Sequence, residues 1–187
     1  MQRSNSNSTD KDSIKTDDYP FAGFAGDEAT AHAHRAAKLI SEYLELTPAA
    51  KTRLQKFIQK MLYYKSYNLD DLCTATAVVQ KLAQVPCFRD FREDMAHGTA
   101  ISNGTHRLNN ADEFPVLLFS GAYSLAESLN SPGVCSDDYA SKLVLDTKAF
   151  SPQEIANMAK ELYRWFDCNL EVSSAELDSV KAVLISN

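Results

Sequence analysis

The spacing of the apolar residues is the feature that most constrains how this chain can fold. From residue 28 onward apolar side chains recur every three or four positions, as in Leu54, Phe57, Ile58, Met61 and Leu62. That spacing places side chains on one face of an α-helix. No stretch of useful length alternates apolar and polar residues, and 6 glycines and 6 prolines are few for a turn-rich sheet protein. The sequence therefore predicts an all-α fold.

The pattern divides into about seven helices. We expect helices over 28–46 and 48–66, a third with Asn68 as its N-cap, a strongly apolar one over 114–129 and a shorter one over 136–146. Two more are marked by capping boxes, in Ser151-Pro152-Gln153-Glu154 and from Ser173 to Glu176, because a Ser three residues before a Glu satisfies the first backbone donors of a helix. The third helix and the 114–129 helix are predicted to be the buried central helices.

The length of 187 residues suits one domain. Residues 1–27 are predicted to be a disordered or loosely ordered arm, because the first eighteen residues are mostly Ser, Asn, Asp and Lys. Tyr19, Phe21 and Phe24 end this arm, either tucked against the domain or, as the alternative, serving as a docking peptide. Residues 28–187 form the predicted helical domain, with a long loop near 85–112.

Charge and cysteine usage bound the classes of partner and compartment. The net charge of −6 gives no overall basic field, so nucleic acid and anionic membranes are disfavoured as partners. No apolar run reaches the roughly 20 residues that span a bilayer, and no signal peptide is readable. The four cysteines are widely spaced and predict reduced thiols in an intracellular protein, cytoplasmic or nuclear.

No catalytic motif stands out. A glycine-rich phosphate loop, a nucleophile elbow and a paired-histidine zinc motif are all missing from the sequence. His32 and His34 are two residues apart, which points them to different helix faces, so both are predicted to be surface histidines. His97 and His106 lack the convergent ligands that a zinc site needs. We therefore predict no enzyme activity, no metal and no cofactor.

At this point the order of features resembles the cyclin-box family. The later half of a cyclin box is matched by LLFSGAYSLAES, then DDYASKL, then FSPQEIANMAKELYRWFDCNLEVS, and the first two box helices by RLQKFIQKMLYYKSYNLDDLCTATAVVQKLA. The resemblance covers roughly residues 50–175 and is closest in character to single-box fungal cyclins of the phosphate-signalling type. It implies a five-helix box, with an extra N-terminal and an extra C-terminal helix here, and a cyclin-dependent kinase as the partner.

The resemblance also implies specific residues, and two of them are missing. The lysine that grips the kinase in the family falls on Ser128, and the gripping glutamate falls on Ala159. Glu127 and Lys160 stand next to these positions with the opposite polarity, so a charge-reversed grip is an alternative, although one residue along a helix turns a side chain by about 100°. Arg53 matches the family's structural arginine, whose acidic partner is replaced by Gln80.

The leading hypothesis is thus a non-catalytic, cyclin-like protein-binding subunit that engages a cyclin-dependent kinase through altered contacts. The alternative is a degenerate cyclin fold that acts as a kinase-independent scaffold or regulatory protein, and a nucleic-acid-binding cyclin fold comes third. The basic run on the 48–66 helix is either a solvated face or, on a cyclin-like domain, part of the partner surface. The predicted partner-binding residues are Lys51, Arg53, Lys56, Lys60, Glu127, Ser128, Ala159, Lys160 and Tyr163.

Overall fold

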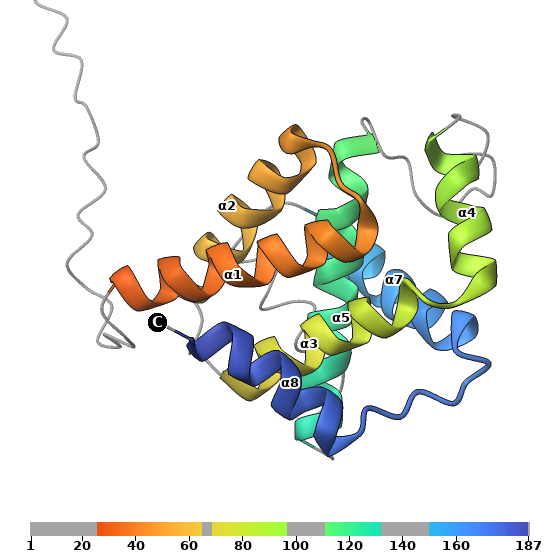
Figure 1. Ribbon diagram of the computed structural model, residues 1–187. Coiled ribbons are helices and arrows are strands. Elements are labelled where there is room, and N and C mark those ends of the chain that lie inside the picture. The colour runs from red at the N-terminus through yellow and green to blue at the C-terminus, as the bar shows by residue number, and fades with distance from the viewer. Residues whose placement is uncertain (1–25, 65–68, 97–110, 132–149, 187) are drawn as a thin grey trace, which may run out of the picture.

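A computed structural model describes residues 26–64, 69–96, 111–131 and 150–186. Within these ranges every regular element is a helix, so the all-α prediction is confirmed (Figure 1). The elements, in chain order, are α1 (Gly26–Leu44), α2 (Pro48–Tyr64), α3 (Leu69–Leu82), α4 (Pro86–Ala96), the short 3-10 helix η2 (Ala111–Glu113), α5 (Phe114–Asn130), α7 (Pro152–Trp165) and α8 (Ser174–Ile185).

Helix α5 is the centre of the fold. Its residues from Phe114 to Glu127 are all buried, because the segment is apolar on nearly every side. It packs against α3 on one side and α7 on another, and α2 also touches it. Helix α3 is buried from Asp71 to Val79. The prediction that these two helices are central is confirmed.

Glycine at position 121 lets α5 and α7 approach closely. A β-carbon added to Gly121 would lie 2.7 Å from Cγ of Met158 and 3.1 Å from the backbone nitrogen of Ala159. Real β-carbons essentially never come within 3.0 Å of another atom, so any side chain at this position would require Met158 to shift and would crowd the backbone of α7.

Helices α1 and α2 form an antiparallel hairpin that packs on α3. The amide of Gln59 donates to the hydroxyl of Thr30 at 3.1 Å, and the imidazole of His34 contacts the amide oxygen of Gln55 at 3.3 Å. These two pairs fix the register of the hairpin. From the first pair to the second, the position on α1 advances by four residues and the position on α2 goes back by four.

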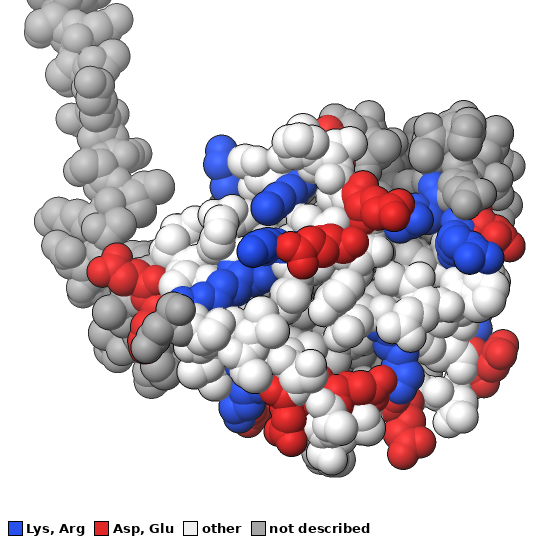
Figure 2. Space-filling view, viewed as in Figure 1, with Lys and Arg blue, Asp and Glu red and all other residues white. Residues whose placement is uncertain are grey.

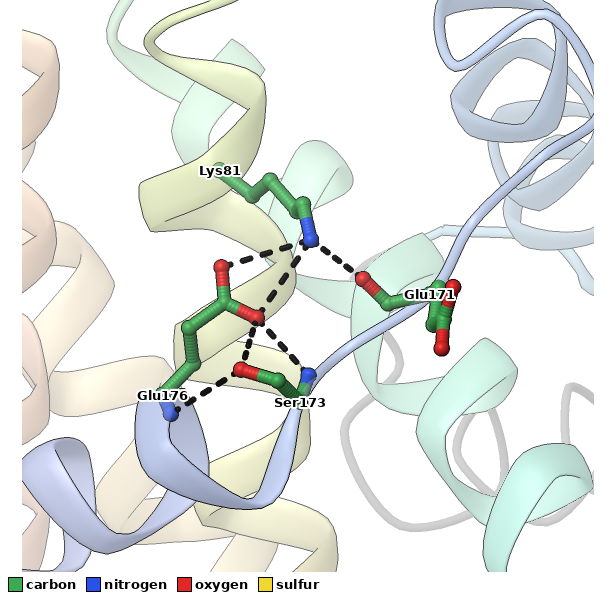
Figure 3. Close-up of polar contacts among 4 residues, drawn as sticks. All are labelled: Lys81, Glu171, Ser173 and Glu176. Carbon is green, nitrogen blue, oxygen red and sulfur yellow. Dashed lines mark hydrogen bonds and ion pairs between the residues drawn. The ribbon is translucent and has the colours of Figure 1, made fainter.

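Helix α8 packs against α3 and also contacts α1. Val180 and Leu184 are buried in the core, and Lys181 pairs with Asp70 of α3 at 2.9 Å. Lys81, near the end of α3, reaches Glu176 at the start of α8 at 3.3 Å and also donates to the carbonyl of Glu171 (Figure 3). These two ion pairs hold α8 antiparallel to α3.

The predicted loop near 85–112 is wrong in its first part, because α4 occupies Pro86–Ala96. Proline at the first helical position is compatible with a helix start, and Phe88 and Phe91 form an aromatic cluster with Phe114 and Trp165. Ring centroids lie 5.1 Å apart for Phe88 and Trp165 and 5.6 Å apart for Phe91 and Phe114. The helix is short and largely polar, so its apolar pattern was too brief to be recognised in the sequence.

Other predicted boundaries agree to within a few residues. Both capping boxes are present, with Ser151 and Ser173 each accepting from the backbone of the Glu three residues later. The predicted arm over 1–27 lies almost wholly outside the described residues, as do Asn68 and the 136–146 helix. Among the described helices, none has the length and apolar character needed to cross a bilayer.

Candidate partner-binding surface

Helix α2 is unusual in its charge. It carries Lys51, Arg53, Lys56 and Lys60 and no acidic residue, whereas each of the other described α-helices contains Asp or Glu. The whole chain has a net charge of −6. A basic surface has therefore been concentrated on one helix of an acidic protein.

The amphipathic pattern of α2 directs these cations outward. Leu54, Ile58 and Met61 are buried, and Arg53, Lys56 and Lys60 follow one another at three- and four-residue spacing on the exposed side. Lys51 lies nearer the edge that faces α1 and is half-buried. The sequence prediction of a solvent-facing basic run on this helix is confirmed.

Arg53 is held by an acidic residue that the sequence did not reveal. Its guanidinium donates to the carboxylate of Glu113 at 3.0 Å, and Thr47 donates to Asp112 at 3.1 Å. Both acids belong to η2, immediately before α5, so the pair ties the start of α2 to the start of the central helix. Glu113 lies 60 residues away from Arg53 in sequence, and the spacing alone could not indicate it.

Lys51 and Lys56 make no ion pair or side-chain hydrogen bond within the part of the chain that the structure describes. Both can therefore bind an external anion without first breaking a contact inside the protein. In Figure 2 basic side chains lie over α1 and α2, and acidic side chains adjoin them over α1 as they do over α3 and α8.

The positions expected to grip a kinase are placed differently. Glu127 is only 4% exposed and Ala159 8%, so neither side chain lies on the surface. Ser128 is half-buried, and its hydroxyl donates to the carbonyl of Ser124 at 3.1 Å. Of the remaining predicted residues on α7, Lys160 is exposed and Tyr163 is 36% exposed.

The predicted surface thus separates into two groups. Lys51, Arg53, Lys56 and Lys60 lie on α2, and Lys160 and Tyr163 lie on α7, which stands on the other side of α5 in Figure 1. The charge-reversed grip needs Glu127 and Lys160 on the surface together, and the burial of Glu127 prevents that. The α2 group is the coherent candidate surface.

His32 corrects another prediction. It is only 9% exposed, and its Nδ1 lies 2.9 Å from the carbonyl oxygen of Leu184, which also accepts from the Arg35 guanidinium at 2.7 Å. Helix α8, which provides that carbonyl, covers this face of α1, so His32 has a structural role at the end of α8. His34 is exposed as predicted.

Metal-ligating and thiol groups are sparse in the described ranges. No group of three or more His, Cys, Asp or Glu side chains there is placed to hold a metal ion. Cys73, Cys87 and Cys168 are free thiols, and burial raises the pKa of Cys73 to about 11. A low thiol pKa is what a reactive cysteine requires, so Cys73 is a packing residue.

Comparison with known proteins gives no relative from which a function could be transferred. No protein-family model matches the chain, and neither the curated proteins nor the solved structures contain a significant match.

Proposed function

We propose that this chain is a non-catalytic, cyclin-like protein-binding module whose partner contacts α2. The observation that carries the proposal is the segregation of four basic side chains and no acidic ones on this helix. Exposed charge of one sign steers association and selects the orientation of a partner.

The order of the helices supports the cyclin-like part of the proposal. Helices α2 and α3 precede an apolar central helix, α5, and α7 opens with a capping box and packs against α5. The resemblance assigns the first, second, third and fifth helices of the box to these segments, and α4 lies between the second and the third.

A specific observation favours the kinase-independent form of the module. Ala159, at the family's glutamate position, is only 8% exposed, and the hydroxyl of Ser128, at the lysine position, donates to the carbonyl of Ser124. Neither position therefore presents an exposed, unengaged polar group to a kinase. We therefore place regulation or scaffolding through α2 ahead of activation of a cyclin-dependent kinase.

Cross-linking mass spectrometry on the full chain, captured with its bound proteins from its native cell, tests the proposal. We expect a saturable protein partner with cross-links from Lys51, Lys56 or Lys60 on α2. Lys160 on α7 serves as the matched exposed lysine, because it too is solvent-accessible but lies outside α2. Cross-links confined to Lys160, or the recovery of no saturable partner, would contradict the proposal.

Binding to purified cyclin-dependent kinases separates the two forms of the module. We expect no binding that depends on Ser128 or Lys160, so that the Ser128→Lys and Lys160→Glu variants behave like the natural chain. A kinase complex that either substitution disrupts would restore the kinase-binding hypothesis.

A further inference from the structure

The register of the α1–α2 hairpin brings a further lysine, Lys38, to the basic surface. Thr30 lies opposite Gln59 and His34 opposite Gln55. Continued four residues further on α1 and four residues back on α2, this register assigns Lys38 to the position opposite Lys51. Lys38 is exposed, and like Lys51 and Lys56 it has no ion pair in the described part of the chain.

We propose that Lys38, Lys51 and Lys56, hereafter the hairpin lysines, bind an acidic peptide segment of a partner protein. This inference rests on the proposed function and specifies the chemistry of the partner. Two like charges facing each other across a helix seam repel, and an external carboxylate relieves that repulsion by binding between them. No described side chain of the protein itself provides such a carboxylate to these three lysines.

The side chains between the lysines are polar, and their hydrogen bonds are made within the protein. Gln55 and Gln59 are half-buried and hydrogen-bonded to α1 across the seam. An acidic segment lying along α2 would therefore contact fixed amides and free ammonium groups. From Lys51 to Lys56 the rise along the helix is about 7.5 Å, which matches about two residues of extended peptide.

The surroundings favour an acidic protein segment over nucleic acid. Glu42 stands one turn beyond Lys38, Asp112 and Glu113 lie beside the start of α2, and Glu45 pairs with Arg92 at 3.2 Å. Duplex DNA has one charge per roughly 1.7 Å of its axis, so its phosphates would also meet these acids. A short peptide can place its carboxylates on the lysines alone.

The test measures the affinity of the full chain for a labelled peptide of about eight aspartate and glutamate residues, a length that covers the span of α2. We expect binding at about 0.05 M salt that weakens strongly by about 0.5 M, because exposed charges are screened. The K51E/K56E variant should bind about tenfold more weakly, since two attractions become repulsions.

The matched control is Arg89→Glu on α4, an exposed cation away from α2 with no side-chain contact among the described residues. It should change the affinity by less than about twofold. A second variant, K51A/K56A, removes charge without introducing any and should lie between the natural chain and K51E/K56E, with the helical circular dichroism of all variants unchanged. Equal affinities for the natural chain and K51E/K56E, or an equal loss in R89E, would overturn the inference.

Three further outcomes identify which part of the argument fails. If duplex DNA competes as well as the peptide, the surface is a nucleic-acid site and the acidic-peptide inference is wrong. If a captured partner binds K51E/K56E as tightly as the natural chain, the inference fails while the binding module stands. If the peptide binds through the hairpin lysines but no protein is captured, the proposed protein-binding function is wrong, while the inference that the hairpin lysines bind acidic groups is kept.

Discussion

The lysines of α3 and α8 differ from the hairpin lysines in what lies opposite them. Lys81 faces Glu176 and Lys181 faces Asp70, and both pairs join α8 to α3. Lys38, Lys51 and Lys56 instead have no acidic partner among the described residues. The same residue type therefore serves cohesion on one side of the molecule and remains available for binding on the other.

The difference between these two sets of lysines arises from the charges around each set, because both sets lie on helices that pack on the same hydrophobic core. Ion pairs between exposed groups contribute at most about 1 kcal/mol each, so the α3–α8 interface depends mainly on its buried residues, and its charges set register. On the α1–α2 hairpin, Gln and Thr set the register. Lys38, Lys51 and Lys56 make no ion pair or side-chain hydrogen bond among the described residues.

The rate of alkylation should differ most strongly between the buried thiol of Cys73 and the exposed thiol of Cys87. Cys73 is buried on α3, and burial raises its pKa to about 11 from an ordinary value of 9.0, with Lys181 acting in the opposite direction. At pH 8 we expect Cys73 to be alkylated at least about a hundredfold more slowly than exposed Cys87, because the thiolate is the reactive form. Peptide mapping after timed alkylation measures both rates. Similar rates would mean that α8 detaches readily from α3.

Truncation of the buried contact of α8 should produce the largest loss of stability. Leu184 is fully buried, and Leu184→Ala is expected to lower the free energy of unfolding by about 2–4 kcal/mol, since it leaves a cavity. Val183, 42% exposed on the same helix, provides the control: Val183→Ala should change stability by less than about 0.5 kcal/mol. Urea unfolding measures both. Equal effects would place the attachment of α8 outside the core.

The capping box of α8 gives a smaller effect. Ser173 accepts from the backbone nitrogen of Glu176 at 3.3 Å, and Glu176 accepts from the backbone nitrogen of Ser173 at 2.7 Å. Ser173→Ala should lower the free energy of unfolding by about 1 kcal/mol. Ser174, the next residue, makes no side-chain hydrogen bond in the described ranges, so Ser174→Ala should be close to neutral. The reverse ranking in urea unfolding would contradict the box.

Acid should weaken the same end of α8. The hydrogen bonds from the Ser173 backbone and hydroxyl, together with Lys81, hold the pKa of Glu176 below its ordinary value of 4.5. Since the folded-state pKa is the lower one, this stabilisation is present above the unfolded-state pKa and is lost as the pH falls through the folded-state pKa. The stability difference between the natural chain and Glu176→Gln should therefore shrink below about pH 4.5. Glu171→Gln is the control, because only the backbone carbonyl of Glu171 is used; a constant difference for Glu176→Gln would contradict the assignment.

The sequence was sufficient wherever structure depends on local pattern. Periodicity located α2 and α5, and the two Ser-to-Glu boxes located the starts of α7 and α8, because caps and amphipathic faces are determined within a few residues. It missed α4, whose two aromatic residues acquire partners only when Phe114 and Trp165 are brought next to them. Long-range packing determines such a helix.

The candidate site was only half predictable for the same reason. The basic run of α2 was visible in the sequence, but Lys38 joins it only through the hairpin register, and Glu113 neutralises part of it from another element. Ala159 was expected at the surface because the resemblance aligned it with a gripping residue, and Glu127 because it stands next to Ser128, the other aligned position; both side chains are buried. A match between two sequences does not determine whether the matched residues are buried.

The direct test of the comparison replaces one lysine on each side with an uncharged residue of similar length. Lys81→Met should lower the free energy of unfolding by about 0.5–1 kcal/mol at low salt, and by less at high salt, because its pair with Glu176 is partly exposed and screened. Lys56→Met should leave stability within about 0.5 kcal/mol, since no described group pairs with it. Affinity for the acidic peptide should show the opposite order, with Lys56→Met weakening it and Lys81→Met leaving it unchanged. Unfolding and binding measured on the same two proteins decide the matter: if both substitutions affect both properties equally, the lysines are not divided between cohesion and binding.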